Sequence, residues 1–395
     1  DGIVVEAGPA ADLLPGLGAD ARVVDHTGRL ILPGFVDCHV HCPQLDIIAA
    51  DGSRLLEWLE RHAYPEEMKF ADRAHAAAVA AAFLDELLRR GTTTALVFAT
   101  VHPQSVDALF EAARARNMRL IAGKVLMDRN CPAALTDDAA TGYSDSRRLI
   151  ERWHGVGRLG YAITPRFAIT SSDAQLEAAG RLAAEFPDVW IHTHLAENAD
   201  EIAEVARLFP ERRGYLDVYR HHGLLRERAV FAHCLHLDRP ELDALAAGHG
   251  AAAFCPTSNL FLGSGLFDLR AATAAGVRVG LATDVGGGTS LSMLTTIGEA
   301  YKVLKLRDQP LPAARAVYLA TLGAARALGL GDRIGSFEPG KEADVVVLDP
   351  AATPLTARRT AGAASIAELI FALAYLGDDR HVAATYVAGE EFSPP

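Results

Sequence analysis

The sequence predicts an α/β protein in which a (β/α)₈ barrel of the TIM type is joined by a small β-sandwich domain. Between residues 34 and 333, eight apolar strand-like runs alternate with helical stretches. Residues 1–33 and 334–395 instead contain short strands and turns, so both ends of the chain are expected to build the small domain together. Histidine or acidic side chains follow several of the eight runs. This alternation over about 300 residues favours a closed parallel barrel over an open doubly wound sheet.

The predicted strands are bounded by turn residues and separated by helical patterns. The first leads into His39, and a helix follows in "ADRAHAAAVAAAFLDELLRRG", with Asp72 as its N-cap and Gly91 just past its end. A second helix is expected around 104–117 and another near 364–376. Wide intervals after His41 and after Glu197 are expected to hold loops and extra helices. The other seven strand candidates are "TTTALVFAT", "RLIAGKVLMD", "LGYAITPRF", "VWIHTHL", "AVFAHC", "GAAAFCP" and "VRVGLATD".

The hydrophobic content and the net charge indicate which kinds of partner the protein binds. Half of the 395 residues are hydrophobic and the formal net charge is −12, which argues against a nucleic acid and favours a small-molecule substrate. The five cysteines are scattered without a C-x-x-C pair, so neither a disulfide framework nor a four-cysteine zinc site is expected, and a cytoplasmic location fits. No apolar run is long enough to cross a membrane. The strand-like opening "DGIVVEAG" suggests that further residues precede Asp1.

Histidines and acids gather where the predicted strands end. In "LPGFVDCHVHCPQ", His39 and His41 lie two residues apart, so both imidazoles project from one face of a strand. The other ends carry "HTHLAEN" with His192, His194 and Glu197, "AVFAHC" with His233, and "LATD" with Asp284. Barrel enzymes assemble their sites at these ends, and imidazole with carboxylate suits zinc. Agreement among several strands predicts a metal site, although chance placement of single histidines is an alternative.

Longer motifs resemble a known family. The runs "PGFVDCHVH", "HTHLAEN", "FAHC", "LATD" and "GSFEPGKEADVVVLD" are similar to those of the amidohydrolase superfamily of metal-dependent hydrolases. The narrower motifs "HCPQ", "LLEWLERHAYPEEMKFAD", "GTTTALVFATVHPQS", "ITPRFAITSS" and "FCPTSNLFLGSGLFDL" resemble the guanine deaminases within it. The resemblance covers about residues 30 to 350. Cys42 and Ala196 depart from the common pattern, which affects the expected shape of the site.

The resemblance implies one zinc ion per chain. By this comparison, His233 would lie beside the metal-bound water, and His192 would be structural. A second metal would need a lysine on strand four, and "LGYAITPRF" has none; Lys124 on the preceding strand is the one loose end. The implied metal ligands are His39, His41, His194 and Asp284.

The implied reaction is hydrolytic deamination of guanine to xanthine and ammonia. Zinc lowers the pKa of bound water to roughly 7, and the resulting hydroxide would attack C2 of guanine. Asp284 would take the proton of that water, Glu197 would shuttle protons to the ring and to the leaving amine, and His233 would orient the hydroxide. The alternative for Glu197 is a solvated acid at a helix start.

The resemblance also supplies the substrate contacts. Gln44 would bind a purine edge, Arg166 would donate to a carbonyl oxygen, and Phe167 would stack on the ring. Arg166 could instead form a structural ion pair. Rival functions are deamination of a pterin, a cytosine or a triazine, and a non-catalytic barrel scaffold. Family members are typically homodimers. The full set of expected substrate-binding residues is His41, Cys42, Pro43, Gln44, Arg166, Phe167, His194, Glu197 and Asp284.

Overall fold

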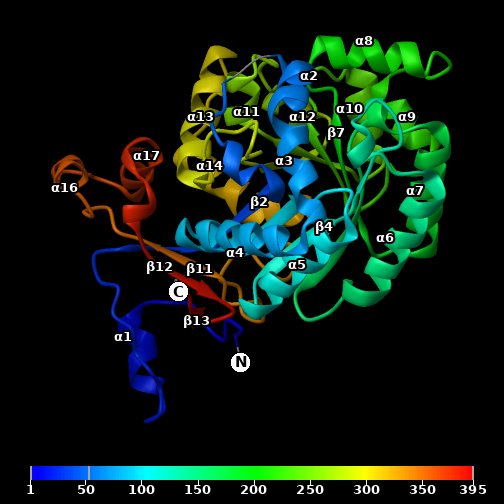
Figure 1. The fold of residues 1–395 in the computed structure, drawn as a ribbon. Coiled ribbons are helices and arrows are strands. Elements are labelled where there is room, and N and C mark those ends of the chain that lie inside the picture. The colour runs from blue at the N-terminus through cyan, green and yellow to red at the C-terminus, as the bar shows by residue number, and fades with distance from the viewer. Residues whose placement is uncertain (1, 52–53, 394–395) are drawn as a thin grey trace.

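Eight parallel strands form the barrel that the sequence predicts. The computed structural model describes residues 2–51 and 54–393, and in it each barrel strand lies beside the next one along the chain (Figure 1). A short additional strand, β5 (Val125–Leu126), pairs with β6. All eight predicted strands are therefore confirmed. Their bounds are β2 Phe35–His41, β3 Thr92–Phe98, β4 Arg119–Gly123, β6 Leu159–Pro165, β7 Trp190–Leu195, β8 Ala229–His233, β9 Ala251–Phe254 and β10 Arg278–Leu281.

The barrel closes just beyond the end of β10. The ladder runs from β10 through to β2, and β2 and β10 do not pair directly within the described residues. The chain after β10 bridges the gap instead, because the Asp284 amide donates to the His39 carbonyl (2.9 Å) and the His41 amide donates to the Val285 carbonyl (2.7 Å). Closure thus places Asp284 next to the two histidines of β2.

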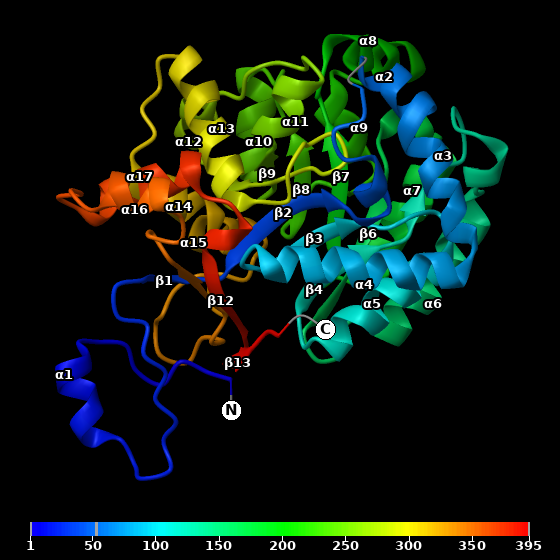
Figure 2. The same cartoon turned by 60° about the vertical axis from the view of Figure 1, so that its left-hand side comes forward.

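Helices cover the outside of the barrel, as Figure 2 shows for α4 to α7. Asp72 caps α4 through the Ala74 amide, and Gly91 follows that helix with φ +80°, as predicted. The wide interval after His41 holds α2, α3 and single turns of 3₁₀ and π-helix, and the interval after Glu197 holds α8 and α9. The barrel helices are α2 Leu55–Trp58, α3 Tyr64–Met68, α4 Arg73–Arg89, α5 Pro103–Ala115, α6 Ala139–Trp153, α7 Asp173–Glu185, α8 Ala199–Leu208, α9 Tyr215–His221, α10 Arg239–Ala247, α11 Pro256–Phe261, α12 Leu269–Ala274, α13 Met293–Leu306, α14 Ala313–Ala320 and α15 Leu322–Ala327.

The two ends of the chain share one antiparallel sheet beside the barrel (Figures 1 and 2). Its order is β1-β11-β12-β13, and α16 (Pro354–Thr360) and α17 (Ile366–Leu376) lie between β11 and β12 in the chain. A separate domain sheet built from both termini is confirmed. The exact boundaries at 33/34 and 333/334 stay a prediction. The strands are β1 Leu30–Pro33, β11 Val345–Leu348, β12 Val382–Val387 and β13 Glu390–Glu391.

The second layer of the expected sandwich is not formed by the described residues. Asp1 of "DGIVVEAG" lies outside them, and the rest of that run makes only an isolated bridge between Ile3 and Glu342. The run before β1 contains Val23 and Val24, which are 61% and 44% exposed. A strand needs a hydrogen-bonded partner, and these valines have none among the described residues. Residues 10–13 form the short helix α1 instead.

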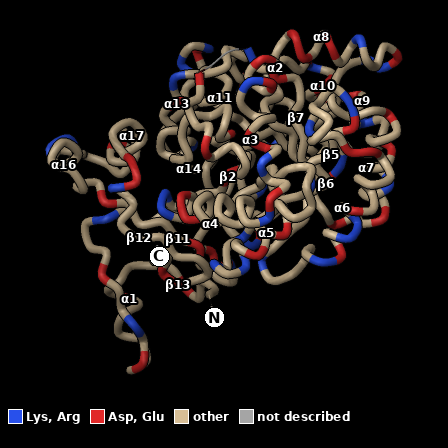
Figure 3. Tube along the Cα trace, viewed as in Figure 1, with Lys and Arg blue, Asp and Glu red and all other residues tan. Residues whose placement is uncertain are grey.

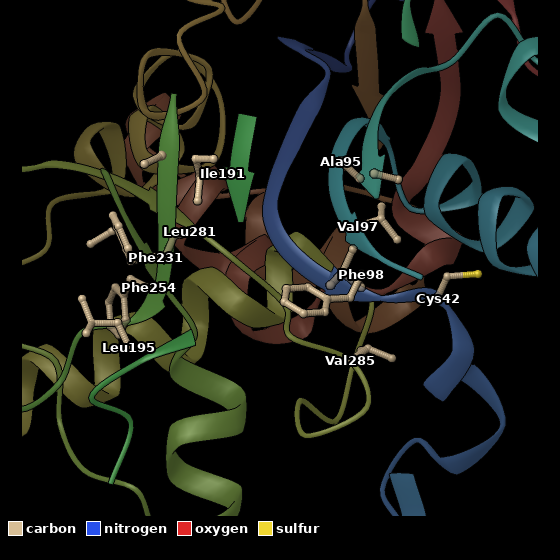
Figure 4. Packing of buried hydrophobic residues seen from close by; sticks show 14 of the residues in the cluster. Cys42, Ala95, Val97, Phe98, Ile191, Leu195, Phe231, Phe254, Leu281 and Val285 are labelled. Carbon is tan, nitrogen blue, oxygen red and sulfur yellow. The ribbon is translucent and has the colours of Figure 1, made fainter. Parts of the chain in front are cut away.

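The core combines many aliphatic side chains with buried aromatic rings and covers both faces of the strands. Every residue of β2, β3, β4 and β6 is buried, which is the pattern of parallel strands covered on both faces. Figure 4 shows part of this core, including Val97 and Phe98 from β3 and Ile191 and Leu195 from β7. Lys, Arg, Asp and Glu are spread over the outer helices (Figure 3). None of the described helices is long and apolar enough to span a membrane.

Candidate active site

Five predicted side chains converge at the carboxyl ends of the barrel strands. His39 and His41 point the same way from β2, His194 comes from β7, His233 ends β8, and Asp284 follows β10. His233 and Asp284 have left-handed backbone angles, with φ of 71° and 50°. Such angles are uncommon for residues other than glycine and recur at functional sites, where the chain must turn a side chain inward. The strand ends therefore meet as the sequence predicted.

The donor atoms of four of these residues lie unusually close together. His41 Nε2 is 3.1 Å from His39 Nε2 and 3.3 Å from His194 Nε2. Asp284 Oδ1 is 3.0 Å from His39 Nε2 and 3.3 Å from His41 Nε2. Ligands about 2.0–2.1 Å from a tetrahedral zinc ion are separated from one another by about 3.3 Å. These four side chains thus fit one zinc ion.

His233 stands slightly outside that set. Its donor atom lies within 4.8 Å of those of His39, His194 and Asp284, so it borders the same cluster. His233 Nε2 is 3.8 Å from Asp284 Oδ2 and 3.4 Å from Glu197 Oε2, and it has no hydrogen-bond partner in the described part of the chain. The shorter contacts favour His41 as the ligand. They leave His233 facing the space between the metal position and Glu197.

Burial keeps the imidazoles neutral and therefore able to bind metal. It lowers the pKa of His41 to about 4 and that of His233 to about 3, because a buried cation loses its hydration. The pKa of His194 lies well below its usual value for the same reason. Burial acts against the charge of Asp284, but the surrounding imidazoles outweigh it and hold the pKa of this carboxyl well below its usual range. Neutral imidazoles of His41 and His194 beside an ionised Asp284 suit a divalent cation.

An aromatic ring and a further histidine fix the ligands in place. His192 Nε2 lies 2.7 Å from His39 Nδ1, so a hydrogen bond between them leaves His39 Nε2 free for a metal. The ring of Phe98, at the end of β3, contacts the rings of His39, His41, His192 and His194 at centroid distances of 4.5–5.3 Å. Figure 4 shows Phe98 lying against the end of β2. His192 lies behind His39, and its structural role stays a prediction. No sequence signal singled out Phe98.

Glu197 and His233 are held by partners that the sequence did not reveal. Ser264 Oγ donates to Glu197 Oε1 at 2.8 Å, and the Asn259 amide lies 2.9 Å from His233 Nδ1. Burial raises the pKa of Glu197 well above its usual value, and the nearby charges of Asp284 and Glu201 act in the same direction. Glu197 therefore lies next to His233 and holds its proton to a higher pH than an exposed glutamate does. Ser264 and Asn259 both lie within the quoted motif "FCPTSNLFLGSGLFDL".

The predicted substrate contacts form a separate buried group. Arg166 Nη1 lies 2.8 and 2.7 Å from the two carboxylate oxygens of Glu67, and Gln44 Nε2 donates to Glu67 Oε1 at 2.8 Å. Arg166, Gln44 and Glu67 are each at most 2% exposed. Glu67 is a residue that the sequence analysis missed, although it lies within the quoted motif "LLEWLERHAYPEEMKFAD". An acidic pair, Glu66 and Glu67, was the available signal.

The remaining predicted residues lie around these two groups. Phe167 follows β6 and its ring is 6.3 Å from that of His194. Cys42 and Pro43 begin the 3₁₀ segment Cys42–Ile47 directly after His41, and both are buried. Lys124 pairs with Asp137, so its ammonium has a partner away from the predicted ligands. Structure thus brings the metal-binding and substrate-binding candidates together at the same end of the barrel.

Residues 30–392 match the model of the Amidohydrolase family. The chain belongs to the amidohydrolase family. Among known proteins, it is 56% identical over 368 residues to the guanine deaminase of Escherichia coli strain K12, covering 93% of this chain and 84% of that one. The solved structure of Escherichia coli guanine deaminase superposes with a TM-score of 0.98 at 53% identity, covering all of this chain and 91% of the other.

Two further solved structures that resemble this chain contain a bound ligand or metal. Guanine deaminase from C. acetobutylicum, determined with guanine bound in its active site, has a TM-score of 0.90 at 29% identity and covers 100% of this chain and 93% of its own. An adenosine deaminase from Xanthomonas campestris, determined with bound zinc, has a TM-score of 0.87 at 28% identity and covers 99% and 86%. The shared barrel thus hosts deaminases of purine compounds, and one of these two structures contains zinc.

Proposed function

We propose that this protein is a zinc-dependent guanine deaminase that hydrolyses guanine to xanthine and ammonia. One observation carries the proposal: the donor atoms of His39, His41, His194 and Asp284 lie close together at the end of the barrel where Arg166 is buried. His233, beside them, is 3.4 Å from Glu197. Similarity along nearly the whole chain to guanine deaminases supports the choice of substrate. The guanine-bound relative supports a purine base at this end of the barrel.

His39, His41, His194 and Asp284 would hold one zinc ion, and the zinc-containing relative supports that metal. The donor set fits because its members are closely spaced and largely buried, and because it combines imidazole nitrogens with one carboxylate. A bound zinc ion would lower the pKa of a water molecule to about 7 and so make a nucleophile available at neutral pH. Lys124 is paired elsewhere, which supports one ion instead of two.

The protein's own residues would move the protons. Asp284, which its neighbours keep ionised, offers a carboxylate oxygen to the proton of the water that attacks C2 of guanine. Glu197, whose pKa is strongly raised, delivers its proton to the ring nitrogen. It then takes up the hydroxyl proton of the adduct and passes it to the amine, which leaves as ammonia, and the proton held by Asp284 restores Glu197. His233 Nε2, 3.4 Å from Glu197, orients the attacking oxygen between the two carboxyl groups. Ser264 keeps the Glu197 side chain in reach.

Arg166, Gln44 and Phe167 would recognise the base. Arg166 donates to the carbonyl oxygen at C6, Gln44 bonds to the purine edge, and Phe167 packs on the ring plane. His41, Cys42 and Pro43 border the base on the side of β2. A site built to donate to a carbonyl discriminates strongly against analogues that lack it, because its buried polar groups would be left unpaired.

A spectroscopic assay with a substrate panel tests this proposal. The zinc-loaded protein is incubated with guanine, a pterin, cytosine and an aminotriazine, and both the ultraviolet spectrum and released ammonia are followed. We expect conversion of guanine to xanthine with one ammonia each, and a loss of at least about 100-fold in Glu197→Gln. Turnover of another ring in preference to guanine would contradict the substrate assignment. Equal activity of Glu197→Gln would contradict the proton shuttle.

A cytoplasmic location and a homodimeric state are further proposals. The five cysteines are scattered and free, which accords with a reducing compartment such as the cytoplasm. Oligomeric state is measured directly by light scattering of the purified protein. A monomer at micromolar concentration would contradict the homodimer.

A further inference from the structure

We propose that Glu67 is a positioning residue that holds Arg166 and Gln44 in the orientation needed to recognise the carbonyl oxygen of the substrate. This inference rests on the proposed function and names the origin of its selectivity. Glu67 lies on α3, in the interval between β2 and α4, and nothing in the chemistry of deamination itself requires a carboxylate there. Its place beside two predicted substrate contacts, instead of beside the metal ligands, defines its role.

The contacts of Glu67 occupy one part of each partner and leave another part free. Both of its oxygens accept from Nη1 of Arg166, at 2.8 and 2.7 Å. In the described part of the chain, Nε and Nη2 of Arg166 make no hydrogen bond, so several of its five N–H groups remain to donate to a ligand. The ring of Tyr64 faces the guanidinium at 5.3 Å and restricts it from another side.

Gln44 is anchored at both ends of its amide. Its Nε2 donates to Glu67 Oε1 at 2.8 Å, and its Oε1 accepts from the amide of Gly286 at 3.2 Å. An amide's oxygen and nitrogen are told apart by their partners, and these two partners fix which way round the group lies. One N–H and one lone pair remain. Glu67 therefore decides the orientation of Gln44 as well as that of Arg166.

Electrostatics explains why a carboxylate is needed. A buried, unpaired guanidinium would be strongly disfavoured. Burial acts against the charge of Arg166, but the Glu67 carboxylate outweighs it, and the pKa of Arg166 is raised above its usual value. The pair leaves the guanidinium as a directional donor without a net cation in the site. Such an arrangement suits a neutral base with an exposed carbonyl oxygen.

The local backbone is consistent with a functional placement of Glu67. The helix α3 is preceded by a turn of π-helix, Leu59–Ala63, and π turns occur frequently at functional sites. The neighbouring Glu66 points elsewhere, because its Oε2 accepts from Lys69 at 2.6 Å and Lys69 is more than half exposed. Two adjacent glutamates of one helix thus have different partners, which provides a matched control.

The test compares guanine with 2-aminopurine, which is guanine without the carbonyl oxygen at C6. We expect wild-type protein to prefer guanine by at least about 100-fold in kcat/KM, Glu67→Gln to reduce that preference at least tenfold, mainly through KM, and Glu66→Gln to keep it. Zinc content should remain at one per chain in all three, since Glu67 does not touch the metal ligands. A purely structural ion pair would lower both substrates' rates equally.

The reciprocal exchange Gln44→Glu/Glu67→Gln gives a second readout. In this variant, position 44 carries the carboxylate and position 67 carries the amide. The carboxylate can still accept from the Gly286 amide, and the amide at 67 can donate to the carboxylate at 44. We expect it to recover at least part of the guanine preference that Glu67→Gln loses, and to restore folding if the single variant does not fold. An unchanged preference in Glu67→Gln, or an exchange variant that folds without recovering it, would overturn the inference. If the wild-type protein turns over guanine without preferring it to 2-aminopurine, the contact between Arg166 and the carbonyl is wrong, and the inference falls with it. If guanine is not turned over at all, the proposed function is wrong instead.

Discussion

At the scale of single residues, the site is defined by how the metal-ligand candidates are oriented. The HxH spacing placed His39 and His41 on one face because side chains alternate along a strand, and this required no tertiary information. The residues behind them were not predictable in the same way. Phe98, Asn259 and Ser264 reach the site by packing and by long-range hydrogen bonds, which leave no periodic signal in the sequence.

His192 provides the first residue-scale prediction. Because it fixes the ring of His39 through a 2.7 Å contact, His192→Asn is expected to weaken zinc binding about 10- to 100-fold. Competition with a chromophoric chelator measures this affinity. The exposed His249 has a left-handed backbone angle that asparagine tolerates, so His249→Asn is the matched control and should bind zinc as the wild type does. Equal affinity in both variants would refute the orienting role.

At the scale of secondary-structure elements, hydrogen bonds between β2 and the end of β10 close the barrel next to the predicted metal ligands. Asp37, two residues before His39, accepts from the amide and the hydroxyl of Thr283 and from the amide of His39. This side chain joins the strand that carries two predicted ligands to the segment that carries Asp284. The eight strands were predictable from apolar runs between turns, but this closure was not, since it replaces a regular ladder.

Replacing Thr283 probes that junction. In Thr283→Val, an oxygen of the buried Asp37 loses its hydroxyl donor, and we expect the free energy of unfolding to fall by about 1–3 kcal/mol. Urea unfolding measures the change. Thr94, also fully buried, has a hydroxyl without a partner among the described residues, so Thr94→Val should be neutral or stabilising. Equal losses in the two variants would show that the junction contributes nothing specific.

At the scale of the whole molecule, the sequence predicted the barrel better than the terminal domain. The barrel's strands are buried on both faces and read as continuous apolar runs. The run before β1 is short, exposes Val23 and Val24, and has no partner strand among the described residues. The interval 42–71 was predicted only as loops and helices. Its 3₁₀ and π turns, which bring Glu67 to Arg166, depend on tertiary packing.

The buried histidines predict how the stability of the metal-free protein depends on pH. The folded-state pKa values of His41 and His233, about 4 and about 3, lie below the unfolded value of about 6.5, so the unfolded chain binds more protons in this window. The free energy of unfolding should therefore fall as pH decreases from about 6.5 towards 4. His233→Asn removes one such group, and its decline should be shallower by up to about 1.4 kcal/mol per pH unit. Parallel urea titrations of both proteins from pH 7 to 4.5 test this, and identical slopes would contradict it.

Zinc titration of metal-stripped protein tests the central proposal, a single-zinc guanine-deaminating site, most directly. Xanthine and ammonia formed from guanine are measured at each addition of zinc, alongside bound metal per chain. We predict no turnover without metal, equal amounts of the two products, and a linear rise that stops at one zinc per chain. Asp284→Ala should show neither the rise nor tight binding. Turnover by the stripped protein, a rise that continues to two ions, or a fully loaded protein that leaves guanine unchanged would contradict the account.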